Sequence, residues 1–214
     1  MEKVSGSTIK NLTAPYYTRQ NLEIILGSNR RTLDYRISKL ISEDILETIK
    51  PGFYINKRQL LQSSQKDIFL EYVGNVAKYP SYVSLEYALS KYGLIPESIY
   101  AVTYITTKKT GEYSSSVSPF KYRNIKPKLF TDYEERDFGG AKYLFAKEYK
   151  ALFDFIYLTP LEKLSDFKQL LFGSRINWDA LLQGEKDDFA KLCTASGSKK
   201  MQKVVNLLTK EGLL

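Results

Sequence analysis

The clearest pattern near the start of the chain is a set of apolar residues at helical spacing. It predicts a helix over residues 29–41, with Ser28 as its N-cap. A shorter helix is expected over residues 19–26, capped by Thr18 and ended by Gly27. The longer helix has one apolar stripe, made of Leu33, Ile37, Leu40 and Ile41. Two short helices joined by a glycine-containing turn form a helix-turn-helix pattern.

A change of period follows the second helix. Residues 45–49 and 53–55 are typical of two strands, and Lys50-Pro51-Gly52 between them is typical of a turn. A hairpin directly after a helix-turn-helix is the wing of a winged helix. We therefore predict a winged helix-turn-helix domain over residues 1–60.

The remainder, residues 61–214, alternates between helical and extended patterns. A helix is expected over residues 84–92 and further helices beyond residue 147, with a Gly-Ser turn region at 110–116. Extended segments are expected at residues 98–107, 120–125, 128–130 and 141–146. The predicted fold class is α+β: the N-terminal winged helix, then a larger α+β domain with a small sheet flanked by helices.

The amino-acid composition limits the kinds of catalytic and metal sites that this chain can form. The 214 residues include no histidine and one cysteine, Cys193, and carry a formal charge of +8. These counts exclude Ser-His-Asp and Cys-His catalysis, two-histidine or thiolate zinc sites and an intrachain disulfide. We expect no metal, no cofactor and no enzymatic activity, and the positive charge favours a polyanionic partner.

The chain start lacks the apolar segment of a secretory signal, and no apolar run approaches the roughly 18 residues of a membrane span. These features predict a cytoplasmic protein with no membrane partner.

The outer face of the second helix is polar and cationic. At about 100° per residue, side chains opposite the apolar stripe project outward. We expect Arg31, Thr32, Tyr35 and Lys39 to contact base edges in the major groove, and Arg30, Arg36 and Lys50 to contact phosphates. The alternatives are a solvated helix face and a winged helix that docks a protein.

A second basic segment lies between residues 106 and 130, where Glu112 is the only acidic residue. Its cations are interleaved with aromatic residues, a mixture that can hold phosphates and stack bases. Two other uses are docking of an acidic partner protein and lysine protection of a sheet edge. The candidate residues are Lys108, Lys109, Lys121, Arg123, Lys126 and Lys128.

Several segments together resemble one protein family. Residues 17–22, 40–46 and 51–54 resemble the winged-helix opening of AbiEi-type antitoxins, from the type IV (abortive infection) toxin–antitoxin systems of bacteria. Residues 82–94 are similar to that family's "tyrosine, serine, then Ser-Ala-Leu, then His-Gly-Leu" segment, with residues 100–103 following at a similar place. Residues 146–154 resemble its "Ala, then Glu-Arg-Ala-Leu-Leu-Asp" helix. Departures from the family pattern are Asp44 for glycine, Tyr87 for serine and Tyr92 for histidine.

The resemblance implies a function. Such antitoxins repress their own operon through the winged helix and neutralise a nucleotidyltransferase-like toxin through the larger domain, without being enzymes. For this chain it implies an antitoxin and autorepressor, bound to double-stranded promoter DNA as a monomer or weak dimer.

Two other functions remain open. One is a ligand-sensing winged-helix regulator without a toxin. The other is a metal-dependent nuclease, since Glu148 and Lys150 have the Glu-x-Lys spacing and Asp132 or Asp137 lies upstream. Nuclease chemistry needs that pair on a strand, whereas the spacing after Lys147 predicts the start of a helix.

Overall fold

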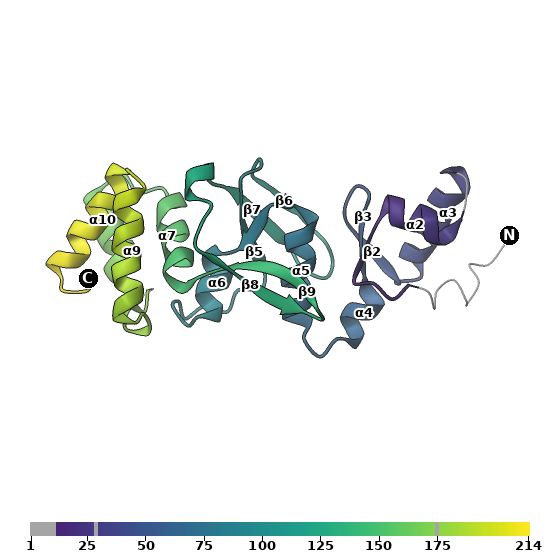
Figure 1. The fold of residues 1–214 in the computed structure, drawn as a ribbon, viewed down its shortest axis with the longest axis horizontal. Helices are drawn as coiled ribbons and strands as arrows, with labels where there is room; N and C mark the ends of the chain where they lie inside the picture. Colours follow the sequence, from purple (N-terminus) through teal and green to yellow (C-terminus); the bar gives the residue numbers. More distant parts are fainter. Residues whose placement is uncertain (1–11, 28–29, 174–175) are drawn as a thin grey trace.

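A computed structural model describes residues 12–27, 30–173 and 176–214. The fold is mixed α+β, and the molecule is elongated (Figure 1). Helices α2 (Arg19–Leu26) and α3 (Arg30–Ser42) lie at one end, and α9 (Gln183–Ala195) and α10 (Lys199–Lys210) lie at the other. A six-stranded sheet lies between them.

The N-terminal module, residues 12–27 and 30–56, combines α2 and α3 with an antiparallel sheet of order β1-β3-β2. Its strands are β1 (Tyr16–Thr18), β2 (Leu46–Lys50) and β3 (Phe53–Asn56). The expected helices and hairpin are present, while β1 is an addition to the prediction.

Two local residues show why the module folds as the sequence predicts. Thr18 caps α2, where its hydroxyl accepts from the Asn21 amide and the Asn21 side chain accepts from the Thr18 amide. Asp44 adopts the left-handed backbone that glycine would supply, with φ of 58°. Ser28, the expected cap of α3, lies outside the described residues.

Apolar side chains of the module pack into two different cores. The smaller core joins α2 and α3 to the sheet through Leu22, Leu33, Ile37, Leu40 and Tyr54. Ile49, Phe53 and Ile55 belong instead to the large core of the rest of the chain. The hairpin therefore packs on both sides, and the boundary expected near residue 60 falls inside α4 (Lys57–Gln62).

The sheet domain, residues 57–173 and 176–214, is built on the six-stranded sheet of order β6-β7-β5-β4-β9-β8. Most neighbouring strands are antiparallel, while β4–β9 and β5–β7 are parallel. The strands are β4 (Ser81–Val83), β5 (Val102–Thr106), β6 (Gly111–Tyr113), β7 (Phe120–Asn124), β8 (Tyr133–Phe138) and β9 (Ala141–Ala146).

Helix α5 (Lys66–Ala77) covers one face of this sheet. Tyr122 donates to the Gly74 carbonyl at 2.6 Å, and Tyr104 donates to the carbonyl of Glu71 at 3.0 Å. A Cβ added to Gly74 would lie 2.2 Å from the Tyr104 hydroxyl, so the glycine permits the close approach of helix and sheet.

Helices α6 (Leu85–Lys91) and α7 (Glu148–Leu158) pack together, and α7 also contacts α9. α8 (Leu164–Phe172) precedes α9, and α10 buries Met201, Val204 and Leu208. Among the described residues, no helix combines the length and apolarity needed to span a bilayer.

Two local expectations need correction, and strand β8 has no counterpart among the predicted elements. The segment expected to be extended at residues 128–130 is instead largely part of the 3-10 helix η1 (Pro127–Leu129), because proline favours the first position of a helical turn. Part of the expected turn at 110–116 is the edge strand β6. Strand β8 was not anticipated, because Tyr133–Phe138 is an edge strand rich in charged residues.

Candidate functional site

The outer face of α3 is the first candidate site. Leu33, Ile37 and Leu40 are buried beneath it, which turns the intervening positions toward solvent. Arg31 is exposed, and Tyr35 is 45% exposed on the same side. The helix therefore presents a cation and an aromatic ring side by side, one turn apart.

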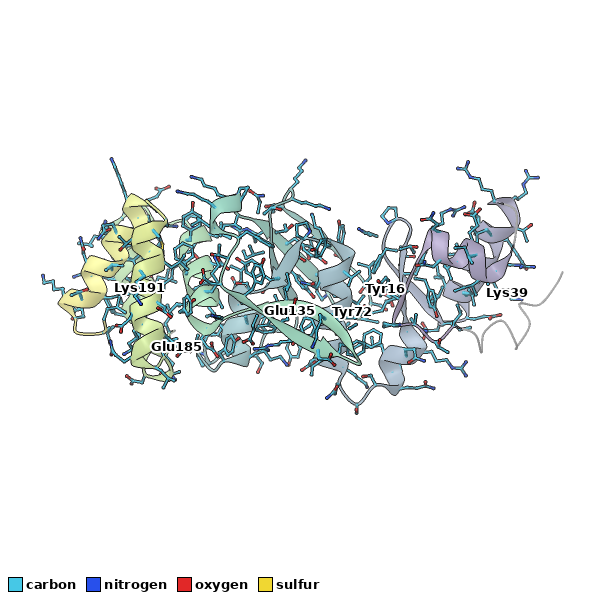
Figure 2. The ribbon with its side chains drawn as sticks, in the orientation of Figure 1. Tyr16, Lys39, Tyr72, Glu135, Glu185 and Lys191 are labelled. Atoms are coloured by element: carbon cyan, nitrogen blue, oxygen red, sulfur yellow. The ribbon has the colours of Figure 1, made fainter. Side chains whose placement is uncertain are left out.

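Other predicted residues flank this face, and two of them, Arg36 and Lys39, have partners within the protein. Arg30 is exposed, whereas Thr32 is half-buried. Arg36 is half-buried and donates to the Leu26 carbonyl at 2.5 Å. Part of its guanidinium therefore caps the C-terminal end of α2. Lys39 is also half-buried and pairs with Glu43 at 3.8 Å (Figure 2).

The one acidic side chain within α3 is already paired. Asp34 accepts a hydrogen bond from Arg19 of α2, and that bond lowers the pKa of the Asp34 carboxyl. In the part of the chain that the structure describes, no carboxylate pairs with Arg31. The face of α3 keeps a net positive charge.

Lys50 does not lie on this face. Its ammonium donates to the Ala77 carbonyl at the end of α5, and it lies 5.8 Å from the centre of the Tyr113 ring. The expectation that Lys50 contacts phosphate beside α3 does not fit this position. The sequence pattern of the hairpin could not show that its tip faces the sheet domain.

The six candidate basic residues of the sheet domain are all exposed, on and around β7. Lys121 and Arg123 alternate along β7 and so share one face of the sheet. Lys108 and Lys109 lie near the end of the same strand, since the Asn124 side chain donates to the Lys108 carbonyl at 3.0 Å. Lys126 and Lys128 continue toward α9, where Lys128 donates to the Ser196 carbonyl at 3.2 Å.

Two of the segments that resemble the antitoxin family, residues 82–94 and 146–154, meet in a buried polar cluster. The carboxylate of Asp154 accepts from Tyr82 and Ser84, each at 2.9 Å, and from Lys150 at 2.6 Å. Lys150 also donates to the Leu129 carbonyl at 2.8 Å. Both charged groups are completely buried, so these residues join α7 to the sheet.

The same cluster contains Lys150, the lysine of the Glu-x-Lys pair that the nuclease hypothesis rests on. Helix α7 begins at Glu148, as the spacing predicts, and Lys150 points into the core. Burial raises the pKa of Glu148, with Glu185 adding to the effect. Within the described residues, no three acidic or cysteine side chains form a group that could hold a metal ion.

A second buried carboxylate was not anticipated. Glu71 of α5 accepts from Tyr87 at 2.8 Å and from Tyr143 at 2.7 Å. Burial raises the pKa of its carboxyl, and the two tyrosine hydrogen bonds oppose that shift. A glutamate in the middle of an amphipathic helix carries no sequence signal for such a role, because its partners come from distant segments.

A cavity of about 480 Å³ lies beside this cluster, a size typical of small-molecule sites. It is bounded by α5, α6 and the start of β5, and the Lys91–Asp67 ion pair lies on its wall at 2.6 Å. Ser90, Ser98 and Ser118 also line it. The cavity combines apolar surface with a few polar groups.

No protein-family model matches this chain, and no curated protein matches it.

Proposed function

We propose that the N-terminal module is a winged helix-turn-helix that binds double-stranded DNA through α3, and that the protein is a transcriptional repressor. The proposal depends on the outer face of α3, where Arg31 has no acidic partner among the described residues and Tyr35 stands beside it. A helix fits the major groove of B-DNA, where arginine donates to guanine and an apolar ring edge contacts the thymine methyl group.

The flanking residues suit the phosphate backbone. Arg30 lies at the start of α3, where helix amides and the helix dipole favour an anion. Arg36 and Lys39 have additional bonds within the protein, so we assign the base contacts to Arg31 and Tyr35 and secondary roles to these two cations.

DNA binding is tested on a duplex from the region upstream of the gene. We expect the Arg31→Ala, Lys39→Ala double variant to weaken binding by a few kcal/mol at most, since a base contact contributes about 1–3 kcal/mol. Fluorescence anisotropy at several salt concentrations measures both the affinity and the number of phosphate contacts. Arg58→Ala, an exposed arginine on α4, is the matched control. Equal affinity of the double variant and the control would rule out α3 as the DNA-binding helix.

For the sheet domain we propose the role of an antitoxin that binds a nucleotidyltransferase-like toxin. Support comes from the resemblance of residues 82–94 and 146–154 to AbiEi-type antitoxins and from the exposed cations of β7. Co-expression with the product of the adjacent gene, scored by co-purification and by rescue of growth, tests it. We expect Lys121→Ala with Arg123→Ala to reduce rescue, and Lys142→Ala on β9 to leave it unchanged. Growth that never depends on this protein contradicts the antitoxin role.

The second candidate function is a ligand-sensing regulator without a toxin. The cavity of about 480 Å³ between α5, α6 and β5 favours it. A small molecule from cell extract that co-purifies in one-to-one ratio and changes affinity for the duplex would support this role over the antitoxin.

A further inference from the structure

Two lysines from separate segments meet where the N-terminal module joins the sheet domain, and the charge of a third acts on both. Lys50 ends β2, Lys78 follows α5, and Lys108 follows β5. The ammonium groups of Lys50 and Lys78 lie 5.8 Å and 5.5 Å from the centre of the same ring, that of Tyr113. We call these three lysines the junction lysines.

Among the described residues, none supplies a counter-charge to the junction lysines. Of the residues that the structure describes, no carboxylate lies within ion-pair distance of any of the three. Glu47, on the same strand as Lys50, is occupied by Ser116 and Lys57. Burial lowers the pKa of Lys50 and Lys78, and each pKa is lowered further by the charge of Lys108.

The backbone around the junction lysines keeps the ammonium groups in place. Lys50 donates to the Ala77 carbonyl, immediately before Lys78. At Gly111 a Cβ would lie 3.2 Å from the Lys78 nitrogen, so the missing side chain leaves room for the ammonium group. The positive charges of Lys50 and Lys78 are therefore organised before any ligand arrives, which lowers the free-energy cost of binding.

We propose that Lys50, Lys78 and Lys108 form a binding site for a phosphate group. A phosphate carries a charge of about −1.5 to −2 and three acceptor oxygens, which suits the neighbouring ammonium groups of Lys50 and Lys78 and the added positive charge of Lys108. Because Lys50 belongs to the module and the other two belong to the sheet domain, the bound phosphate links the two parts. It comes from a small phosphorylated molecule or from a DNA strand.

Binding of pyrophosphate to the full chain tests the site by titration calorimetry and by the rise of Tm with pyrophosphate concentration. We expect one-to-one binding, and at least tenfold weaker binding by Lys108→Gln, an exposed position that leaves the fold intact. Lys78→Gln should behave alike, whereas Lys66→Gln, at the other end of α5, should match the wild type. Equal affinity in Lys108→Gln, Lys66→Gln and wild type overturns the proposal, as does an equal loss in Lys66→Gln.

A competition arm identifies the source of the phosphate. If the site holds a DNA phosphate, a saturating duplex displaces pyrophosphate and Lys108→Gln weakens duplex binding. If it holds a small molecule, pyrophosphate binds the duplex-loaded protein with unchanged affinity. Arg31→Ala separates this proposal from the function of α3, because we expect it to weaken duplex binding while pyrophosphate binding persists.

Discussion

At the scale of single residues, the most consequential feature is the completely buried Lys150–Asp154 pair. Each charge depends on the other, because neither reaches water and both have lost their hydration. The hydrogen bonds from Tyr82 and Ser84 complete the shell of the carboxylate.

We expect Asp154→Ala to lower the free energy of unfolding by about 3–5 kcal/mol, since it leaves a buried ammonium without a charge partner. The double change Lys150→Met with Asp154→Leu should cost less than Asp154→Ala alone. Urea denaturation of the variants measures these differences. The control is Asp188→Asn, which removes the exposed ion pair to Lys191 (Figure 2) and should cost below about 1 kcal/mol. A similar small loss for Asp154→Ala would contradict the role of the buried pair.

Glu71 leads to a prediction on pH. Burial holds the pKa of its carboxyl above the ordinary 4.5, so the folded protein retains the proton to higher pH than the unfolded chain does. The free energy of unfolding therefore decreases as pH rises from about 4.5 through the folded pKa. We expect the stability advantage of wild type over Glu71→Gln to shrink between pH 4.5 and pH 7. Urea denaturation across this range measures it, and parallel profiles would show that the pKa of Glu71 is not raised.

At the scale of elements, the effect of replacing a helix glycine by alanine depends on whether other atoms already occupy the space that the added methyl group needs. Gly74 lies against Tyr104 and Phe120 of the sheet, whereas Gly184 of α9 has nothing within 4 Å of its added Cβ. The same substitution should then have opposite effects at the two positions.

We expect Gly74→Ala to lower the free energy of unfolding by about 1–3 kcal/mol through overpacking. Gly184→Ala should raise it by about 0.4–1 kcal/mol, because alanine favours the helix and restricts the unfolded chain. Chemical denaturation of both variants checks the signs. Destabilisation by both would contradict the open environment of Gly184.

Element by element, the predictions from sequence succeed where one periodicity lasts. Three residues of the predicted stripe of α3 are buried, and the exposure of Arg31 and Tyr35 follows from them, whereas Ile41, the fourth residue of that stripe, is 37% exposed. Strand β8 cannot be predicted in this way, because its mixed charged and aromatic residues show no clear alternation of apolar and polar positions. Nor can the position of Lys50, since Ala77 and Tyr113 lie far away in sequence.

At the scale of the whole molecule, module and sheet domain are joined by packing as well as by hydrogen bonds. Phe53 stacks on Tyr16 with ring centres 4.9 Å apart, and Tyr16 contacts Tyr72 of α5 at 6.0 Å (Figure 2). Glu47 accepts from Ser116 across the same junction. Unfolding of the two parts should therefore be coupled.

We expect Phe53→Ala to split one thermal transition into two, because it removes a shared side chain at a cost of about 3–5 kcal/mol. Differential scanning calorimetry detects the split. Phe189→Ala, a buried change in α9, should lower Tm without separating the transitions. A single transition in Phe53→Ala would show that other contacts carry the coupling.

The two-sided hairpin also determines how the protein can be divided for laboratory work. A fragment cut after residue 62 exposes Ile49, Phe53 and Ile55, which the intact chain buries in its large core. Exposing each of these side chains removes about 1.5–3 kcal/mol of hydrophobic stabilisation. Together they form an exposed apolar patch that favours aggregation. A soluble fragment that carries the N-terminal module needs either α5 retained as a cover or polar replacements at these three positions.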